Sequence, residues 1–140
     1  MEAMTTEQVR AHVEAAILKA ISLGYRVCAD VGWGAEYRQS EAWTPSVLVE
    51  YGNKRCCAGG AFLLFGPPEM VQAPLDPQKG AAWVFGQAFG MSSNEVSAFV
   101  RGFDSVFVGD PEEGPSDRAS LVWCNLGSLM GQFAGRHNDG

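Results

Sequence analysis

The sequence contains little of what membrane proteins and secreted proteins need. Its longest apolar run, residues 58–65, contains two glycines and is followed by Pro67 and Pro68. A helix that spans a bilayer needs about 20 apolar residues, so we expect no membrane segment. No basic and apolar signal segment precedes Thr5, and 140 residues can form a core without disulfide staples. We therefore expect a cytoplasmic protein with reduced cysteines.

Positive charge is also scarce. The 140 residues include 10 Lys and Arg against 16 Asp and Glu, which gives a formal net charge of −6. Such a charge repels phosphate groups and attracts basic partners, so nucleic-acid binding is disfavoured. Hydrophobic residues make up 46% of the chain, and no linker or internal repeat interrupts it. A single globular domain over residues 1–140 is the expectation.

Metal and cofactor motifs are missing. The four cysteines form no C-x-x-C pair and the two histidines form no H-x-x-x-H pair, whereas a closed zinc site needs four ligands at paired short spacings. Gly32 and Gly34 lack the third glycine and the following helix of a dinucleotide fingerprint. We expect no metal and no cofactor. No complete catalytic set is apparent, which favours a non-enzymatic protein and leaves the question open.

The hydrophobic pattern predicts a mainly α-helical fold, a compact bundle of about five helices. The first helix is expected to begin after Thr5 or Thr6 and to stop at Gly24, and a buried helix is expected over residues 56–65. Between them, two segments have the composition of short strands, which allows a two-stranded β-hairpin between helices one and two. These segments are residues 25–28 and 47–51, and the last helix is expected to end at Gly135.

Residues 76–104 predict two short helices that have both ends marked. The first has an N-cap residue, a proline at the first helical position and a left-handed glycine stop. The second has a capping box and a glycine stop. These signals are Asp76, Pro77 and Gly90 for the first helix and Ser92, Glu95 and Gly102 for the second.

This hairpin, residues 77–102, has the apolar and glycine spacing of a helix-turn-helix that reads DNA. Its second helix offers mainly small polar side chains to a partner, while phosphate anchoring needs several Lys or Arg. The exposed candidates are Ser93, Asn94, Ser97 and Arg101. A purely structural hairpin is therefore preferred, and DNA binding is kept as an alternative.

Cys56 and Cys57 stand at an expected helix start, directly after Lys54 and Arg55. A helix N-terminus and basic neighbours lower a thiol pKa, so a cysteine-dependent enzyme or redox protein is one hypothesis. Adjacent cysteines lack the geometry of C-x-x-C redox motifs. Buried structural cysteines are the preferred interpretation.

Carboxylates are concentrated in residues 104–117, which contain five of them and no basic residue. An acidic loop of this kind suits recognition of a basic protein surface. Two aromatic residues in a glycine-rich loop belong to the types enriched at interface hot spots, and they can equally well cover the edge of the core. The expected binding residues are Asp104, Asp110, Glu112, Glu113, Asp117, Trp33 and Tyr37.

A family resemblance follows from the order of the motifs. Cys57 to Ala61 spells C-x-x-G-A, preceded by an isolated Trp43 and followed by the capped hairpin, a Phe103-Asp104 turn and a final amphipathic helix. Residues 43–130 thereby resemble small actinobacterial and phage proteins known only as domains of unknown function. Phe103 departs from the polar Asn expected before the Asp. The resemblance implies a helical fold and no activity.

These observations favour a small acidic binding protein, an inhibitor, immunity or regulatory factor that engages a basic protein partner as a monomer or a homodimer. The helix-turn-helix regulator and the cysteine-dependent enzyme remain as alternatives.

Overall fold

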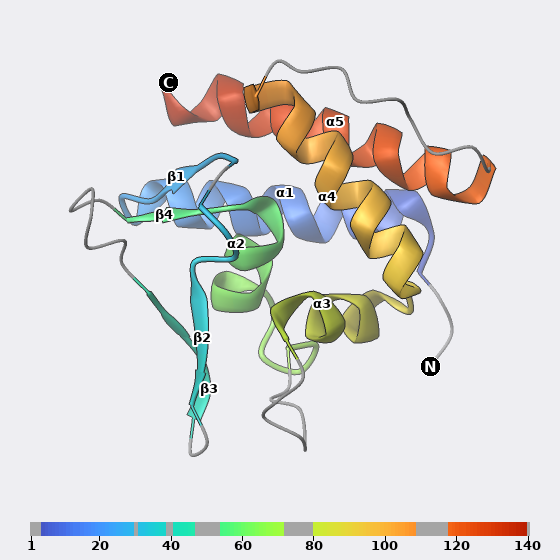
Figure 1. Ribbon diagram of the computed structural model, residues 1–140. Coiled ribbons are helices and arrows are strands. Elements are labelled where there is room, and N and C mark those ends of the chain that lie inside the picture. Colours follow the sequence, from blue (N-terminus) through green and yellow to red (C-terminus); the bar gives the residue numbers. More distant parts are fainter. Residues whose placement is uncertain are drawn as a thin grey trace.

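A computed structural model of the protein describes residues 4–29, 31–38, 41–46, 54–71, 80–108 and 118–139. These residues form five helices and four short strands (Figure 1). The mainly α-helical fold is confirmed, and none of the helices in these ranges is long and apolar enough to cross a membrane. The helices are α1 (Thr6–Ser22), α2 (Ala58–Phe65), α3 (Ala81–Phe89), α4 (Ser93–Val108) and α5 (Arg118–Asn138). The strands are β1 (Arg26–Val27), β2 (Ala35–Arg38), β3 (Glu41–Pro45) and β4 (Arg55–Cys56).

Side-chain caps begin two of the helices where the sequence predicts them. Before α1, the Thr5 hydroxyl accepts the Gln8 backbone N–H at 3.2 Å, and Gln8 Oε1 accepts the Thr5 N–H at 2.9 Å. Ser92 and Glu95 make the same reciprocal pair before α4, at 3.2 and 2.8 Å. Each pair satisfies two backbone donors that the first turn of a helix leaves without partners. Gly90 ends α3 with a left-handed φ of 71°, as expected.

Two glycines that were expected to stop helices lie inside them. α4 continues past Gly102 to Val108, and α5 continues past Gly135 to Asn138. The expected Phe103-Asp104 turn is therefore helical. Gly102 faces α5, where a Cβ would lie 1.9 Å from the carbonyl oxygen of Cys124. Glycine at this position allows the two helices to pack closely and does not end the helix. Sequence spacing alone does not distinguish these two uses of glycine.

Two helix starts also differ from the prediction. α3 begins at Ala81 with Gly80 as its N-cap, and the expected cap and first helical residue, Asp76 and Pro77, lie outside the described residues. α2 begins at Ala58, because Cys56 is still in a strand. Cys57 is the N-cap of α2, and its Sγ accepts the Gly60 N–H at 3.4 Å.

The strands form two separate two-stranded pairs. β2 and β3 make an antiparallel hairpin with a bulge between Glu36 and Arg38, and β1 pairs with β4 in parallel. A hairpin therefore lies between α1 and α2, as the sequence allows. Its strands come from residues 35–45, which lie between the two segments that were expected to form it. Of the two expected strands, 25–28 contains β1, and 47–51 lies outside the described residues.

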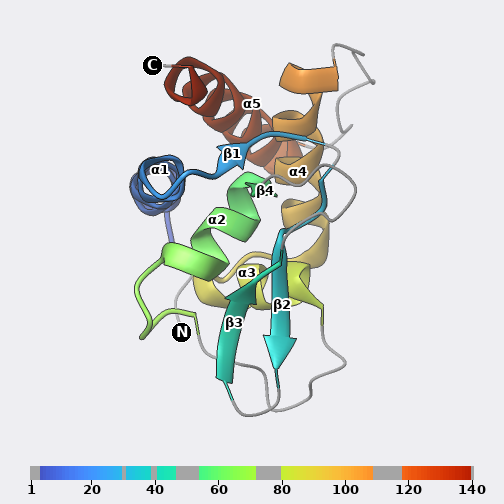
Figure 2. The same ribbon diagram turned by 90° about the vertical axis from the view of Figure 1, so that its left-hand side faces the viewer.

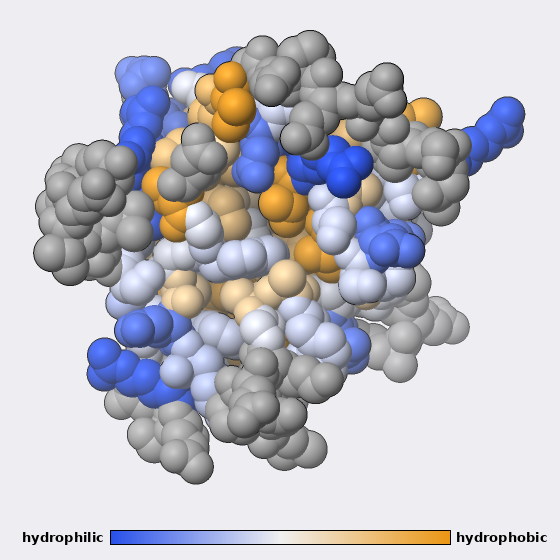
Figure 3. All heavy atoms as spheres, in the orientation of Figure 1, coloured by the Kyte–Doolittle hydropathy of each residue, from blue (hydrophilic) through white to orange (hydrophobic). Residues whose placement is uncertain are grey.

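The helices pack around a core rich in phenylalanine. In Figures 1 and 2, α1 and α5 lie side by side, α4 crosses α5, and α2 and α3 lie below them, with the β2–β3 hairpin extending away from α5. Ring centroids are 4.5 Å apart for Phe62 and Phe89 and 5.5 Å for Phe85 and Phe99, which joins α2, α3 and α4. Figure 3 shows hydrophobic residues reaching the surface over the part of this face that α4 crosses.

α4 and α5 run in the same general direction at a close distance. Added Cβ atoms would lie 2.0 Å from the Phe99 carbonyl oxygen at Gly127 and 2.8 Å from Val106 Cγ2 at Gly131. The glycine stripe on α5 therefore packs inside the domain. At its N-terminal end, the Trp123 indole N–H donates to Glu95 Oε2 at 2.7 Å, so one carboxylate both caps α4 and holds α5.

The C-terminal end of α5 closes the free edge of β1. Asn138 Oδ1 accepts the Val27 N–H at 3.0 Å, and Asn138 Nδ2 donates to the Val27 carbonyl at 2.8 Å. The amide thereby replaces the neighbouring strand that Val27 lacks on this side. Arg26 and Asp139 add an exposed ion pair at 3.5 Å.

Candidate functional site

Trp33, one of the expected binding residues, is packed against the start of α2. A Cβ at Gly59 would lie 1.9 Å from the Trp33 ring, and a Cβ at Gly60 would lie 1.5 Å from the Trp33 carbonyl oxygen. The ring centroid is 5.5 Å from that of Phe85. Trp33 is partly buried against the core, so it covers the core edge, which was the other interpretation of this loop.

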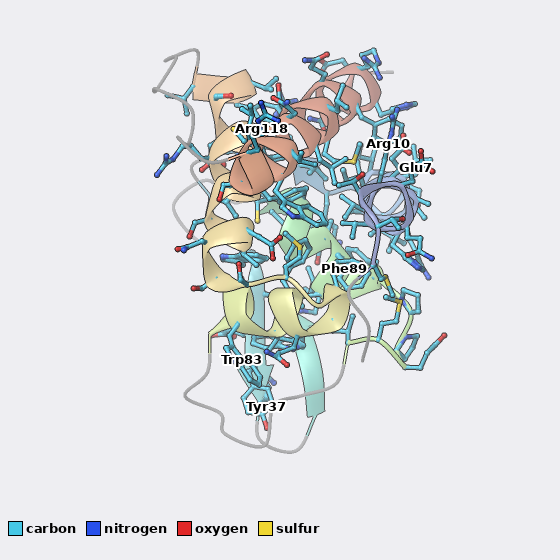
Figure 4. All side chains as sticks on the ribbon, turned by 90° about the vertical axis from the view of Figure 1, so that its right-hand side faces the viewer. Glu7, Arg10, Tyr37, Trp83, Phe89 and Arg118 are labelled. Carbon is cyan, nitrogen blue, oxygen red and sulfur yellow. The ribbon has the colours of Figure 1, made fainter. Side chains whose placement is uncertain are left out.

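Tyr37, the other aromatic candidate, lies in the β2–β3 hairpin. Its ring centroid is 5.5 Å from that of Trp43, whose indole N–H is buried without a hydrogen-bond partner among the described residues. Trp83 of α3 is 43% exposed. Figure 4 shows Tyr37 and Trp83 at the end of the molecule opposite Arg118. The structure therefore packs Tyr37 against Trp43, a residue that the sequence singled out only as part of the family resemblance.

The two thiols of the cysteine pair are buried, and the pKa of each is raised. Burial, together with neighbouring Cys57 and Cys28, raises the pKa of Cys56 to about 12. Burial also raises the pKa of Cys57 to about 11, although the Gly60 and Gly59 N–H groups act in the opposite direction. The expectation of a lowered pKa is wrong, because loss of hydration outweighs the helix N-terminus. The preferred interpretation, buried structural cysteines, agrees with side-chain exposures of 0% and 8%.

The expected acidic binding residues divide into two groups. Asp104 lies half-buried in α4, close enough to Cys57 to contribute to the raised pKa of that thiol. The other four lie outside the described residues, between the end of α4 and the start of α5; they are Asp110, Glu112, Glu113 and Asp117. Asp104 is therefore part of the helical framework.

The α3–α4 pair has a three-residue connection, Gly90 to Ser92, as predicted. The side chains expected to face a partner are exposed, and they are Ser93, Asn94, Ser97 and Arg101. They form one face of α4, on the side away from the buried Phe99 and Phe103. A single arginine is the only base on this face.

Among the described residues, α1 and α5 line an open groove that sequence reasoning missed. It has a volume of about 150 Å³ and is lined by Thr6, Glu7, Arg10, Val122, Asn125, Leu126 and Leu129. Val122 is 49% exposed and Leu129 is 43% exposed, while Leu126 forms the buried floor. Figure 4 looks along α1 and shows Glu7 and Arg10 on it, with α5 running obliquely past it and Arg118 at the near end of α5.

The outward face of α5 continues this groove along the helix. Six exposed residues follow each other at alternating steps of four and three, a spacing that places them in one stripe. They are Arg118, Val122, Asn125, Leu129, Gln132 and Arg136. No Asp or Glu occurs anywhere in α5, in a chain that contains 16 of them. The spacing of these residues could have been read from the sequence of the last helix. That α1 forms the other wall of the groove could not be inferred from it.

Comparison with protein-family models, with curated proteins and with solved structures gave no match to this chain. Within the described ranges, no group of three or more His, Cys, Asp or Glu side chains is placed to hold a metal ion. The resemblance to small actinobacterial and phage proteins therefore stays a prediction.

Proposed function

We propose that this chain is a non-enzymatic binding protein, of the inhibitor, immunity or regulatory kind, that engages a basic protein partner through the segment between α4 and α5. The observation that carries the proposal is the concentration of charge. Residues 109–117 contain four carboxylates and no Lys or Arg, so they supply −4 of the net charge of −6. A cluster of one sign steers a complementary partner and accelerates association.

The helices on either side of this segment support the proposal. α4 and α5 contact each other through Gly102, Gly127 and Gly131, and Glu95 bonds to Trp123. These contacts fix the points at which residues 109–117 leave one helix and enter the next. A charged segment between two fixed ends loses less conformational entropy on binding than one with a free end.

The test is differential capture from a lysate of the source organism. The wild-type chain, an E112Q/E113Q variant and an E36Q/E69Q variant are immobilised and washed over a salt series. Glu36 and Glu69 are exposed residues outside the acidic segment, so both double variants have a net charge of −4. We expect a basic protein to be retained by the wild type and by E36Q/E69Q and released by E112Q/E113Q. Equal retention by both variants would contradict the proposal.

Association kinetics with the captured protein sharpen this test. Neutralising Glu112 and Glu113 should lower the association rate about tenfold at low salt and flatten its salt dependence, because steering is screened over about 10 Å at 0.1 M salt. An unchanged association rate together with faster dissociation would instead show that Glu112 and Glu113 act through short-range contacts in the complex.

DNA binding is the second candidate, and the exposed face of α4 is the observation that favours it. Ser93, Asn94, Ser97 and Arg101 lie where a recognition helix presents its side chains, after a three-residue turn. A gel-shift assay with random duplex DNA at about 50 mM salt tests it, since phosphate contacts are strongest at low salt. Absence of a shift under these conditions eliminates this candidate.

The cysteine-dependent enzyme is no longer proposed, because the pKa values of Cys56 and Cys57 are raised to about 12 and about 11. The described cysteines are all free thiols, which supports a reducing compartment, and we place the protein in the cytoplasm as part of the same proposal.

A further inference from the structure

We propose that the groove between α1 and α5 binds a second copy of this chain, so that two α5 helices pack antiparallel in a twofold symmetric dimer. The surface has the composition of a helix contact. Val122 and Leu129 are exposed by 49% and 43%, and the floor between them is Leu126. Large apolar side chains at this spacing on one exposed face are typical of a helix-in-groove interface.

Symmetry selects a second copy as the occupant. A twofold interface uses the same patch on both molecules, so the patch must be complementary to itself. Val122 and Leu129 lie on either side of Asn125 and Leu126 along the helix. In an antiparallel register, Val122 of one copy packs against Leu129 of the other. The twofold axis then also places Leu129 of the first copy against Val122 of the second. The two Asn125 amides then meet near the axis, where each can donate and accept a hydrogen bond.

The charges at the groove are also complementary to themselves. Glu7 and Arg10 line it from α1 at the level of Val122 to Leu129. A twofold axis at this level brings Glu7 of one molecule toward Arg10 of the other, and the reverse pair follows by symmetry. The same register sets Arg118 opposite position 133 of the second α5, about one helical turn from Arg136 of that copy.

The distribution of charge favours this face over the others. Each copy has a net charge of −6, which opposes association of two copies. α5 contains no carboxylate, so a contact between two α5 helices sets no acidic side chain of one α5 against an acidic side chain of the other. Gly127 and Gly131 face α4 and take no part.

The experiment is sedimentation equilibrium of the full chain over about a thousandfold range of concentration, with a dissociation constant near 10 µM expected for a small interface. The mass should rise from 15.0 kDa to twice this value, and more readily at high salt, which screens the net charge. A constant mass of 15.0 kDa up to about 500 µM would overturn the proposal.

Point variants locate the interface. L129E should raise the dissociation constant at least tenfold, corresponding to about 1.4 kcal/mol. The matched control is W83E, because Trp83 is also 43% exposed and lies at the opposite end of the molecule, as Figure 4 shows. Helical circular dichroism checks that both variants are folded. Equal weakening by both variants, or weakening by W83E alone, would contradict the assignment to α1 and α5.

A charge exchange tests the symmetry without removing apolar contacts. E7R or R10E alone places like charges across the axis and should weaken the dimer, whereas E7R/R10E together restores unlike charges and should recover it. R10E also loses the exposed Arg10–Glu14 pair at 3.4 Å, but this loss remains in the double variant and cannot explain a recovery. A double variant that is weaker than both single variants would rule out the proposed register.

Discussion

The two sides of α5 differ in how closely another helix approaches. Toward α4, three glycines leave no room for a single methyl group, since added Cβ atoms would lie 1.9 to 2.8 Å from atoms of the other helix. Toward α1, a groove of about 150 Å³ remains open and exposes Val122 and Leu129. One side of the helix is therefore packed against α4 within the chain, and the other side keeps an exposed apolar surface.

This difference shows that apolar and small residues have separate functions on one helix. Burial of large side chains stabilises the fold roughly in proportion to area, whereas glycines between helices allow backbones to approach and make many short contacts at once. We call the face of α5 toward α4 the closed side and the face toward the α1 groove the open side. The stability of the monomer should therefore fall with any atom added on the closed side, and it should tolerate substitutions on the open side.

The largest effect is expected at the closed side. G127A places a methyl group 2.0 Å from the Phe99 carbonyl oxygen, so α4 and α5 must separate, at about 3 kcal/mol or more of unfolding free energy. G135A on the same helix meets nothing within 4 Å and should stabilise the chain by about 0.5 to 1 kcal/mol. Urea unfolding measures both. A mild loss in G127A would show that the helices are not in contact there.

The dependence of stability on high pH tests how well the core excludes water from the thiols of Cys56 and Cys57. The pKa of Cys56 is raised to about 12 and that of Cys57 to about 11, from an ordinary value of 9.0. The unfolded chain therefore loses these protons first, and stability that is full below pH 9.0 falls as the pH rises toward the folded pKa values. The expected loss is about 1.4 kcal/mol per pH unit for each thiol.

C57S is the matched variant for this pH dependence. Serine keeps an N-cap acceptor for α2 and removes one titrating thiol. The fall in the unfolding midpoint above pH 9.0 should become about half as steep in C57S. An identical slope in C57S and in the wild type would assign the pH dependence to other groups.

Removal of the Glu95 carboxylate should have the next largest effect. E95A breaks the capping box at Ser92 and leaves the buried Trp123 N–H without an acceptor, at about 2 kcal/mol. E95Q keeps an oxygen for one of the two bonds, so it should lose about half as much. Thermal unfolding distinguishes them, and near-UV circular dichroism reports the surroundings of Trp123. Equal losses in both variants would show that the two bonds do not act separately.

A smaller effect is expected where α5 meets β1. N138A removes both bonds to Val27, and water can reach this half-buried site, so we expect a loss of about 1 kcal/mol. Hydrogen exchange should become faster at the Val27 amide and remain unchanged at the Gln8 amide of α1. Faster exchange throughout the chain would indicate global destabilisation instead.

The smallest effect is expected at the open side. L129Q exchanges an exposed leucine for a polar residue of similar length, and the unfolding free energy at low protein concentration should change by less than about 0.5 kcal/mol. A loss as large as that of G127A would show that the groove belongs to the core and would remove the contrast between the two sides of α5.

Sequence reasoning succeeded where the signal was local. The helix start after Thr5, the capping box at Ser92 and the stop at Gly90 each depend on residues within one turn, and all three lie where they were expected. Gly102 and Gly135 have the same composition signal but continue their helices. Gly102 is required by a contact with Cys124, 22 positions away, which no pattern within one helix reveals.

The candidate sites show the same division. The face of Ser93, Asn94 and Ser97 was correctly expected to be exposed, because the periodicity of one helix determines it. The pKa of Cys56 and the burial of Trp33 depend on several elements packed together, so the local sequence gave the wrong direction for the thiol and left both interpretations open for the tryptophan. The α1–α5 groove required the pairing of two helices about 100 residues apart in the chain.

The Asn138 amide also has a consequence for the order of events during synthesis. Its partner, Val27, precedes it by 111 residues. At an elongation rate of about 5 to 20 residues per second, the ribosome needs on the order of ten seconds to make the intervening chain. During this interval the N–H and carbonyl of Val27 have no Asn138 amide to bond with, so this edge of β1 is closed only after the last turn of α5 has been made.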